Sequence, residues 1–389
     1  MWSAQFAFAG SPLTEAGLLE FVDQNPQWTE LQQTQQQLAD IKLRQAGRWT
    51  DPRFELSQET MERGGQNDRE TSLWLKQDLS PWGMSALEQQ LVEKRNQSEQ
   101  LVLDIQRHAL TRKLRQQFYS ALDVQKQMDS VTRYQVQLSE MAKVIEQRWQ
   151  QGDVSKLDLL RIQNELAAVN IELATLMKRR TIYFQSLSDW IGHPIHQLEG
   201  ELLPNISSLK AAQLAQNPQL QQLALQLEQA EVAKQLAEKQ RYWPDLNIGV
   251  GYKHSNEANT SDGFQIGLAL SLPFFSQKHH AVKLAKTQGK QAGAEKDWLQ
   301  KKLETELNRY LGLLDESIHQ ANQWQTMIEG QNRSIVEMAK ASYRAGELTI
   351  TELLDVYRSE LNHNKNYLNS ARQAREYFIQ VQYLLGEIP

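Results

Sequence analysis

The chain of 389 residues contains no cysteine. This absence excludes disulfides, thiolate zinc ligands and a catalytic thiol, and it leaves no cysteine to carry a lipid anchor. The sequence also lacks any run of about 18 apolar residues, so no transmembrane helix is predicted. The first basic residue is Lys42, so the N-terminus lacks the charged region of a signal peptide. If the protein is exported, we therefore expect this sequence to be either the mature form or a trimmed form of the chain.

Strong charge and catalytic motifs are missing as well. The net charge of −5 is mild, and we expect no nucleic-acid partner because such binders carry a basic face. No nucleophile elbow, phosphate loop or zinc motif is present, so we predict a protein that is not an enzyme and binds no cofactor. His193 with His196 and His279 with His280 lack helical i,i+4 spacing and suitable carboxylates, so no metal site is predicted. The mean hydropathy of −0.61 favours thin helical bundles with narrow apolar seams.

What the sequence does contain is an internal repeat. Three landmarks recur 192 residues later, as from 25 to 217, and two recur 194 residues later, as from 152 to 346. They are Asn25-Pro26 with Asn217-Pro218, Pro52 with Pro244, Pro81 with Pro273, Gly152 with Gly346, and Gly192 with Gly386. A repeat of this kind decides the architecture before local structure does. It divides the chain into a first repeat, residues 1–192, a linker, residues 193–208, and a second repeat, residues 209–389.

Each repeat is predicted to contain a helix, two strands, a very long helix, a turn and a second long helix. The first repeat is expected to have a helix over 15–48, strands over about 53–60 and 71–80, a loop over 61–70, and long helices over about 84–150 and 155–191. The second is expected to have a helix over 209–241, strands over about 245–253 and 264–272, a loop over 254–263, and long helices over about 278–344 and 349–385. Neither proline nor glycine interrupts 84–150, which as one helix would be about 100 Å long.

The strands carry the alternation of membrane strands. Leu246, Ile248, Val250 and Tyr252 share one face of a predicted strand, and small or polar residues occupy the other. Aromatic residues gather at one end of the strands, as in the interfacial girdles of membrane barrels. They are Trp49, Trp82, Tyr242, Trp243, Phe274 and Phe275. Four strands cannot close, and hydrocarbon tolerates no open edge, so two copies with 8 strands or three with 12 are both possible.

The long helices carry heptad-like apolar stripes, such as Leu353, Tyr357 and Leu361, which predict coiled-coil seams rather than sites. A second interpretation is therefore a periplasmic coiled-coil adaptor or scaffold without a membrane barrel. A scaffold has no need of lipid-type alternation in its strands, and it would stay soluble without detergent. The alternation favours a membrane protein over a scaffold.

The turns between the long helices resemble those of a known family. The motifs are RAGELTITELLD, residues 344–355, and QQGDVSKLDLL, residues 150–160. Together with the repeated Asn-Pro and the Trp243-Pro244-Asp245-Leu246 strand start, they resemble the TolC-like outer-membrane efflux proteins. The resemblance covers about residues 14–386 and is strongest to the branch that serves metal- and drug-exporting pumps.

The resemblance implies a mainly α-helical protein with a membrane β-barrel portion, located in the outer membrane of a Gram-negative bacterium. Three chains would each give four strands to one 12-stranded barrel in outer-membrane lipid, and the helices would form a hollow tube through the periplasm. This homotrimer would be a passive duct, with a periplasmic adaptor and an inner-membrane pump, expected to be proton-driven, as partners. The chain departs from the family in lacking a signal sequence and the N-terminal cysteine that many members lipidate.

The resemblance also assigns a periplasmic gate to Glu352 and Asp355. These residues are three apart and share a helix face, so a trimer would place six carboxylates around its axis. Arg161 occupies the place of Asp355 in the first repeat, and we hypothesise an Arg161–Asp355 link that holds the gate shut.

The turns themselves are expected to contact the adaptor. The contact residues implied by the resemblance are Gln151, Gly152, Asp153, Ala345, Gly346 and Glu347. Gly152 and Gly346 permit the positive φ of a tight turn, and Ser155 and Thr349 are predicted to cap the helices that follow.

Overall fold

A computed structural model describes residues 12–63, 66–79, 83–206, 214–243, 245–256, 260–271 and 278–387. The chain divides into two units. Unit 1 comprises Met1–Thr29, Gln106–Asn217 and Lys301–Pro389, and unit 2 comprises Glu30–Ile105 and Pro218–Gln300. Each unit therefore combines segments from both halves of the sequence.

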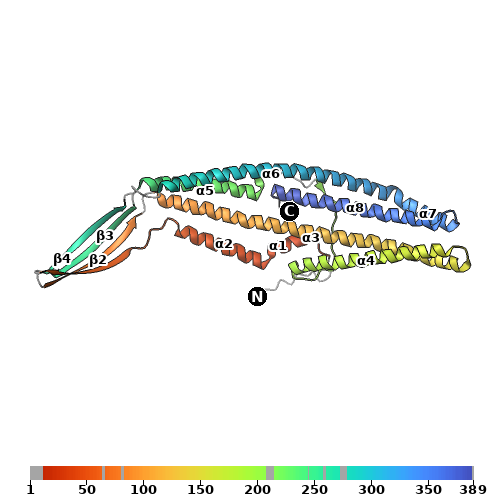
Figure 1. The fold of residues 1–389 in the computed structure, drawn as a ribbon, viewed down its shortest axis with the longest axis horizontal. Helices are drawn as coiled ribbons and strands as arrows, with labels where there is room; N and C mark the ends of the chain where they lie inside the picture. The colour runs from red at the N-terminus through yellow and green to blue at the C-terminus, as the bar shows by residue number, and fades with distance from the viewer. Residues whose placement is uncertain are drawn as a thin grey trace. The chain divides into compact units, whose positions relative to one another are not determined.

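The described chain is mainly helical with one sheet (Figure 1). Its helices are α1 (Glu15–Gln24), α2 (Pro26–Gln45), α3 (Met84–Gln151), α4 (Lys156–Ile191), the short η2 (Leu214–Gln216), α5 (Pro218–Tyr242), α6 (Lys278–Met327), the π-helical η3 (Ile328–Asn332), α7 (Arg333–Ala345) and α8 (Ile350–Leu385). Among the residues described, none of these helices has the length and apolar character needed to cross a membrane.

The repeated Asn-Pro pair begins a helix each time, so the prediction of one continuous helix over 15–48 was wrong. The Asn25 Oδ1 atom accepts hydrogen bonds from the backbone N–H groups of Gln27, at 3.0 Å, and Trp28, at 3.3 Å. Proline suits the first helical position because its missing N–H would have no partner there. The helix predicted over 209–241 likewise begins at Pro218, and residues 207–213 lie outside the described residues.

The long helix predicted over 278–344 is also interrupted, by the π-turn η3. Gly330 lies within this turn, and a glycine lowers the helix propensity at that point. Single π-turns inside α-helices accommodate irregular packing, and here the turn separates α6 from α7.

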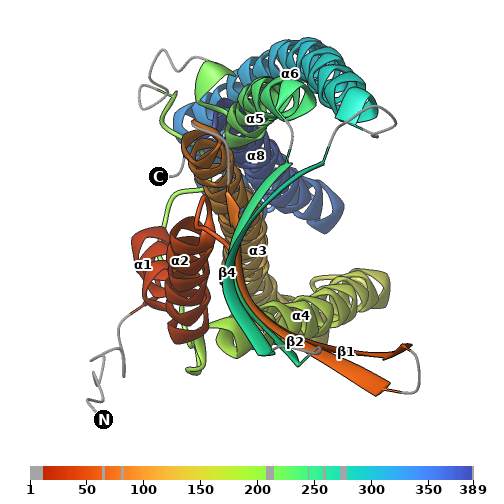
Figure 2. The same cartoon turned by 90° about the vertical axis from the view of Figure 1, so that its left-hand side faces the viewer.

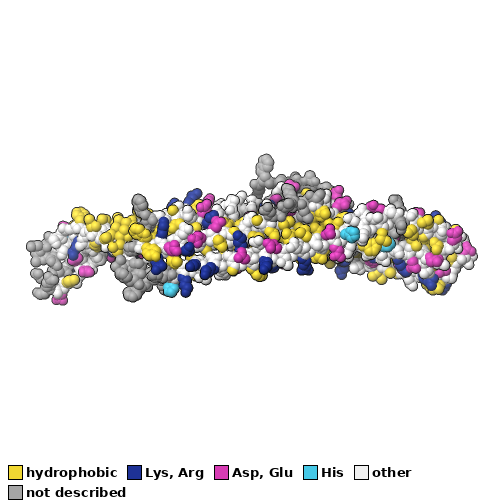
Figure 3. All heavy atoms as spheres, turned by 90° about the horizontal axis from the view of Figure 1, so that it is seen from above, with side chains coloured by type: hydrophobic (Ala, Val, Ile, Leu, Met, Phe, Trp, Pro, Cys, Tyr) yellow, Lys and Arg dark blue, Asp and Glu magenta, His cyan; other side chains and the backbone are white. Residues whose placement is uncertain are grey.

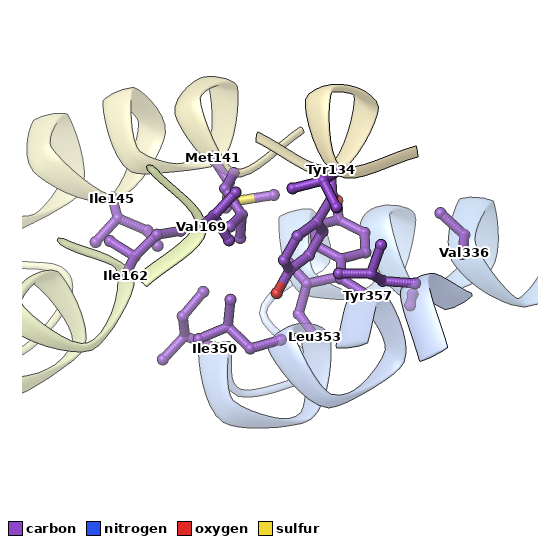
Figure 4. Close-up of a cluster of buried hydrophobic side chains, with 14 of the residues drawn as sticks. Tyr134, Met141, Ile145, Ile162, Val169, Val336, Ile350, Leu353 and Tyr357 are labelled. Carbon is purple, nitrogen blue, oxygen red and sulfur yellow. The ribbon is translucent and has the colours of Figure 1, made fainter. Parts of the chain in front are cut away.

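Helices α3, α4, α7 and α8 share an apolar core in unit 1, in which Tyr134, Leu353 and Tyr357 lie together and Ile162 lies beside Ile145 (Figure 4). Leu353 is 0% exposed and Tyr357 is 1% exposed, which confirms the predicted seam on the last helix. Burying each such side chain contributes about 1.5–3 kcal/mol. This core holds the starts of α4 and α8 in place.

Arg375 fixes the linker between the repeats, and sequence reasoning missed it. The side chain is 8% exposed and donates from Nε to the Leu202 carbonyl at 3.0 Å. From Nη2 it donates to the carbonyls of Glu201, at 2.7 Å, and Leu203, at 3.1 Å. The guanidinium also stacks on the Tyr119 ring, 4.4 Å from its centroid. These bonds satisfy the carbonyl of the buried Leu202 and tie down the carbonyls of its two neighbours.

The sheet lies in unit 2 and contains β1 (Arg53–Arg63), β2 (Gln66–Leu79), β3 (Asp245–Asn256) and β4 (Thr260–Ser271). The strands are antiparallel in the order β1-β2-β3-β4 and form one curved sheet (Figure 2). The central pairing of β2 with β3 joins the two halves of the sequence. The loops predicted over 61–70 and 254–263 are largely strand, because backbone pairing continues after the apolar alternation ends.

The two faces of the sheet differ in polarity, as predicted. One row across all four strands is Phe54, Leu75, Val250 and Ile266, and these partners lie in register. Ile266 is 89% exposed, and its neighbour Phe264 on the same face is 90% exposed. Figure 3 shows apolar side chains, in yellow, exposed over the sheet. The opposite face carries charged pairs, including Arg53–Asp78 at 3.0 Å and Lys76–Glu55.

Candidate functional site at the two helical turns

The turns that join α3 to α4 and α7 to α8 have the same backbone geometry. Gly152 has a φ of 82° and Gly346 a φ of 80°, which confirms the predicted left-handed positions. The Asp153 N–H donates to the Arg148 carbonyl at 2.8 Å, and the Glu347 N–H donates to the Ser342 carbonyl at 2.9 Å. Each turn therefore closes the preceding helix with the hydrogen bond of a Schellman motif.

The helices after the turns begin with capping boxes, which confirms Ser155 and Thr349 as caps. The Thr349 Oγ1 atom accepts from the Glu352 N–H at 3.3 Å, and the Glu352 Oε2 atom accepts from the Thr349 N–H at 2.7 Å. The backbone hydrogen bond from Thr349 lowers the pKa of Glu352. Ser155 and Asp158 form the equivalent pair at the start of α4. Glu352 thus has a local capping role that its assignment to a gate did not predict.

The six residues implied as adaptor contacts are all exposed in the structure. They are Gln151, Gly152, Asp153, Ala345, Gly346 and Glu347. Acidic side chains, in magenta, gather at the end of unit 1 that carries the turns (Figure 3). Two exposed apolar side chains that the sequence analysis did not single out lie near the turns. They are Leu157, which is 56% exposed, and Met338, which is 60% exposed. The turns therefore present acidic and apolar side chains together with the basic Lys156 and Arg344.

The other two residues assigned to the gate are bonded differently from the hypothesis. Arg161 donates from Nη1 to Thr351 Oγ1 at 2.8 Å and lies 3.6 Å from Asp158. Asp355, whose side chain is 64% exposed, pairs with Arg358 at 3.3 Å. Within this chain the hypothesised partners Arg161 and Asp355 are therefore each engaged elsewhere.

Hydrogen bonds to the Glu165 carboxylate connect the two repeats close to Arg161 and Asp355. We call this group of contacts the Glu165 clamp. Arg358 donates from Nε to Glu165 Oε1 at 3.1 Å and from Nη2 to Oε2 at 2.5 Å. The Tyr134 hydroxyl donates to Glu165 Oε1 at 2.7 Å. The hydrogen bonds from Arg358 lower the pKa of Glu165, and burial raises the pKa of Tyr134. Bidentate arginine–carboxylate pairs of this kind are strong and directional.

The Glu165 clamp is the central contact of a ladder between α4 and α8. The ladder comprises the contacts Arg161–Thr351, Glu165–Arg358 and Glu172–Lys365, the last at 2.6 Å. Its residues on α8 are seven apart and therefore share one helix face. Residue numbers rise together on both helices, so α4 and α8 run parallel from the two turns. The ladder ties the first repeat to the helix that carries Asp355.

The aromatic residues assigned to the membrane interface are only partly described. Trp49, Tyr242 and Trp243 are 65%, 73% and 55% exposed, and they precede the starts of β1 and β3. Trp82, Phe274 and Phe275 lie outside the described residues. Within the described ranges, no cluster of three or more histidine, aspartate or glutamate side chains is arranged to hold a metal ion.

Comparisons with known proteins show what this chain is similar to. The sequence profile of the family described as outer membrane efflux protein matches residues 210–387. The cobalt-zinc-cadmium resistance protein CzcC of Cupriavidus metallidurans is 23% identical over 279 residues. That match covers 69% of this chain and 66% of CzcC, slightly less than two thirds of its length.

Solved structures extend the similarity over both halves of the chain. The CmeC outer membrane channel of Campylobacter jejuni has a TM-score of 0.75 at 15% identity, over 96% of this chain and 85% of CmeC. The outer membrane protein VceC of Vibrio cholerae has a TM-score of 0.72 at 14% identity, over 96% of both chains. At these identities the likeness establishes the fold alone. The chain therefore has the fold of outer membrane channels, and its residues 210–387 match the outer membrane efflux protein family.

Proposed function

We propose that this protein is the outer-membrane duct of a tripartite efflux system in a Gram-negative bacterium. It passively conducts substrates that an inner-membrane pump and a periplasmic adaptor deliver. The observation that carries the proposal is the sheet in unit 2, whose apolar rows are exposed in register while its other face carries charged pairs. A scaffold would not expose such a face to water, because large apolar patches promote association.

The duct requires more than one chain. In the described sheet β1 and β4 are edge strands, and hydrocarbon does not accept the unpaired N–H and C=O groups of an open edge. Three chains with four strands each would close a 12-stranded barrel, which is the arrangement implied by the family resemblance. The helices of the three chains then continue as a tube on the periplasmic side. Its partners are two further copies, the adaptor, the pump and outer-membrane lipid.

The particle extracted from outer membranes with detergent is expected to be a trimer by native mass spectrometry. Three chains satisfy the edges of the sheet without leaving a gap in the barrel wall. A dimer would mean closure with 8 strands. A monomer that remains soluble without detergent would contradict the duct and favour the scaffold.

We assign the periplasmic gate to Glu352 and Asp355. Replacing them by glutamine and asparagine removes six charges from a trimer, while glutamine keeps the capping box at Thr349. The double variant is expected to conduct roughly two- to tenfold more current in planar bilayers, because rings of carboxylates constrict a pore. Asp153→Asn with Glu347→Gln removes the same charge from the turns and should leave the current unchanged. Equal currents in the two double variants would reject the assignment.

The turns are proposed to dock the adaptor. Because the chain has no cysteine, single cysteines at Gln151 and Ala345 give unambiguous crosslinking sites. We expect an adduct with the adaptor from either position in intact cells, since both residues are exposed at the turns. A cysteine at Lys178, on the exposed side of α4, is the control and should give none. If neither turn position crosslinks to the adaptor, the turns are not the docking site.

A further inference from the structure

A tryptophan lies over a recess of three glycines on the polar face of the sheet. Trp74 on β2 is the register partner of Gly251 on β3, and Gly249 and Gly267 lie beside it. A Cβ atom on Gly251 would lie 2.7 Å from Trp74 Cδ2, and one on Gly267 would lie 3.0 Å from Trp74 Cζ3. A Cβ atom on Gly249 would lie 3.4 Å from Trp74 Cε3. The indole therefore lies flat against β3 and β4, in space that any other residue would fill.

The tryptophan is an exception on this face. The next residue of β2 on this face is Lys76, whose Nζ atom lies 5.6 Å from the indole centroid. Further along the same face Arg53, Asp78 and Asn247 form a polar group in which Asn247 donates to Asp78 at 2.7 Å. The opposite face carries the apolar rows that would meet lipid. Membrane barrels turn their polar face to the lumen, so Trp74 faces the lumen in the duct proposed above.

We propose that the three glycines seat Trp74 against the barrel wall and thereby set the bore of the duct at this level. This inference rests on the proposed function, because only a closed barrel has a lumen. In a trimer three indoles lie at the same level, one from each chain. Seated flat they leave the lumen open, and tipped inward they narrow it from three sides.

The clashes identify which substitutions unseat the indole. Alanine at Gly267 meets the Trp74 ring at 3.0 Å and no other atom closer than 4.0 Å, so relief requires movement of the ring. Alanine at Gly251 meets the ring at 2.7 Å and also the Leu73 carbonyl at 3.0 Å. Gly263 lies on the same face of β4, and a Cβ atom there has nothing within 4 Å. Gly263→Ala is thus the matched control.

The seat is tested directly by fluorine NMR of the detergent-extracted protein labelled with 5-fluorotryptophan. The Trp74 signal is identified by its loss in Trp74→Phe among the 10 tryptophans of the chain. In Gly251→Ala with Gly267→Ala this signal is expected to shift and to gain solvent sensitivity, whereas Gly263→Ala leaves it unchanged. If the double variant does not assemble, the same measurement is made on Gly267→Ala alone. A Trp74 signal identical to wild type in the alanine variants would show that the glycines do not hold the indole in place.

The bore is tested by conductance in planar bilayers, with the Glu352→Gln and Asp355→Asn changes present so that the periplasmic end does not limit the current. The alanine variants are expected to lose roughly half of the conductance, because side chains at a constriction set its width. Adding Trp74→Ala should restore it. If the conductance loss persists without Trp74, or if no conductance is lost at all, Trp74 does not set the bore. A trimer that carries only the Glu352→Gln and Asp355→Asn changes and conducts no current would instead overturn the proposed function itself.

Discussion

Replacing Ile266 by arginine is expected to remove assembled protein from the outer membrane. Ile266 lies near the middle of β4, is 89% exposed, and pairs with Val250 in an apolar row that crosses the whole sheet. An arginine facing lipid at the bilayer midplane costs about 2–4 kcal/mol. A trimer carries the change three times, for a total of about 6–12 kcal/mol, which is comparable to the entire stability of a typical domain.

Gln265→Arg is the matched control for this variant. Gln265 is the preceding residue of β4, so its side chain projects from the opposite, polar face of the strand. The same arginine there meets water and should leave assembly near the wild-type level. The measurement is the amount of trimer in the outer-membrane fraction, by native mass spectrometry and immunoblotting. Equal amounts of the two variants would show that the faces of the sheet are assigned wrongly.

The alternation that places Ile266 in the exposed apolar row could be predicted from the sequence, but the extent and pairing of the strands could not. Alternation depends only on neighbours two residues apart, and β3 and β4 display it clearly. Beyond residues 61 and 254 the side chains become polar on both faces, so the pattern ends while backbone pairing continues. The β2–β3 pairing joins segments from opposite halves of the chain, which no local pattern encodes.

The turns show the same division between local and distant causes. Gly152, Gly346, Ser155 and Thr349 could be predicted because helix ends are decided by residues within one turn of each other. Asn25-Pro26 carried a comparable local signal, a cap followed by proline, and its meaning as a helix start was missed. The ladder between α4 and α8 gave no local signal. It depends on which faces of two helices meet, and their partners are about 190 residues apart.

Glu165→Gln is expected to loosen the ladder and raise the leak current of the duct. The change removes the charge that receives two hydrogen bonds from Arg358, and hydrogen bonds to charged groups contribute about 1.5–3 kcal/mol. Because the Arg358 side chain is 48% exposed, solvent screening reduces the expected loss to about 1–2 kcal/mol per chain. The variant keeps Asp355 and its contact with Arg358, so any effect on the current comes from the link between α4 and α8.

The pH dependence of stability tests whether the Glu165–Arg358 contact acts through the charge of Glu165. The pKa of Glu165 is lower in the folded chain than its unfolded value of about 4.3. Its contribution is therefore complete above about pH 4.3 and is lost as the pH falls through the lower folded pKa. Melting temperatures of the extracted trimer should fall more steeply below about pH 4 in wild type than in Glu165→Gln. Tyr134→Phe removes one of the hydrogen bonds that lower the pKa of Glu165 but keeps the charge and the Arg358 contact, so its slope should lie between those of wild type and Glu165→Gln. Parallel slopes in wild type and Glu165→Gln would mean that the Arg358 contact does not hold the two repeats together.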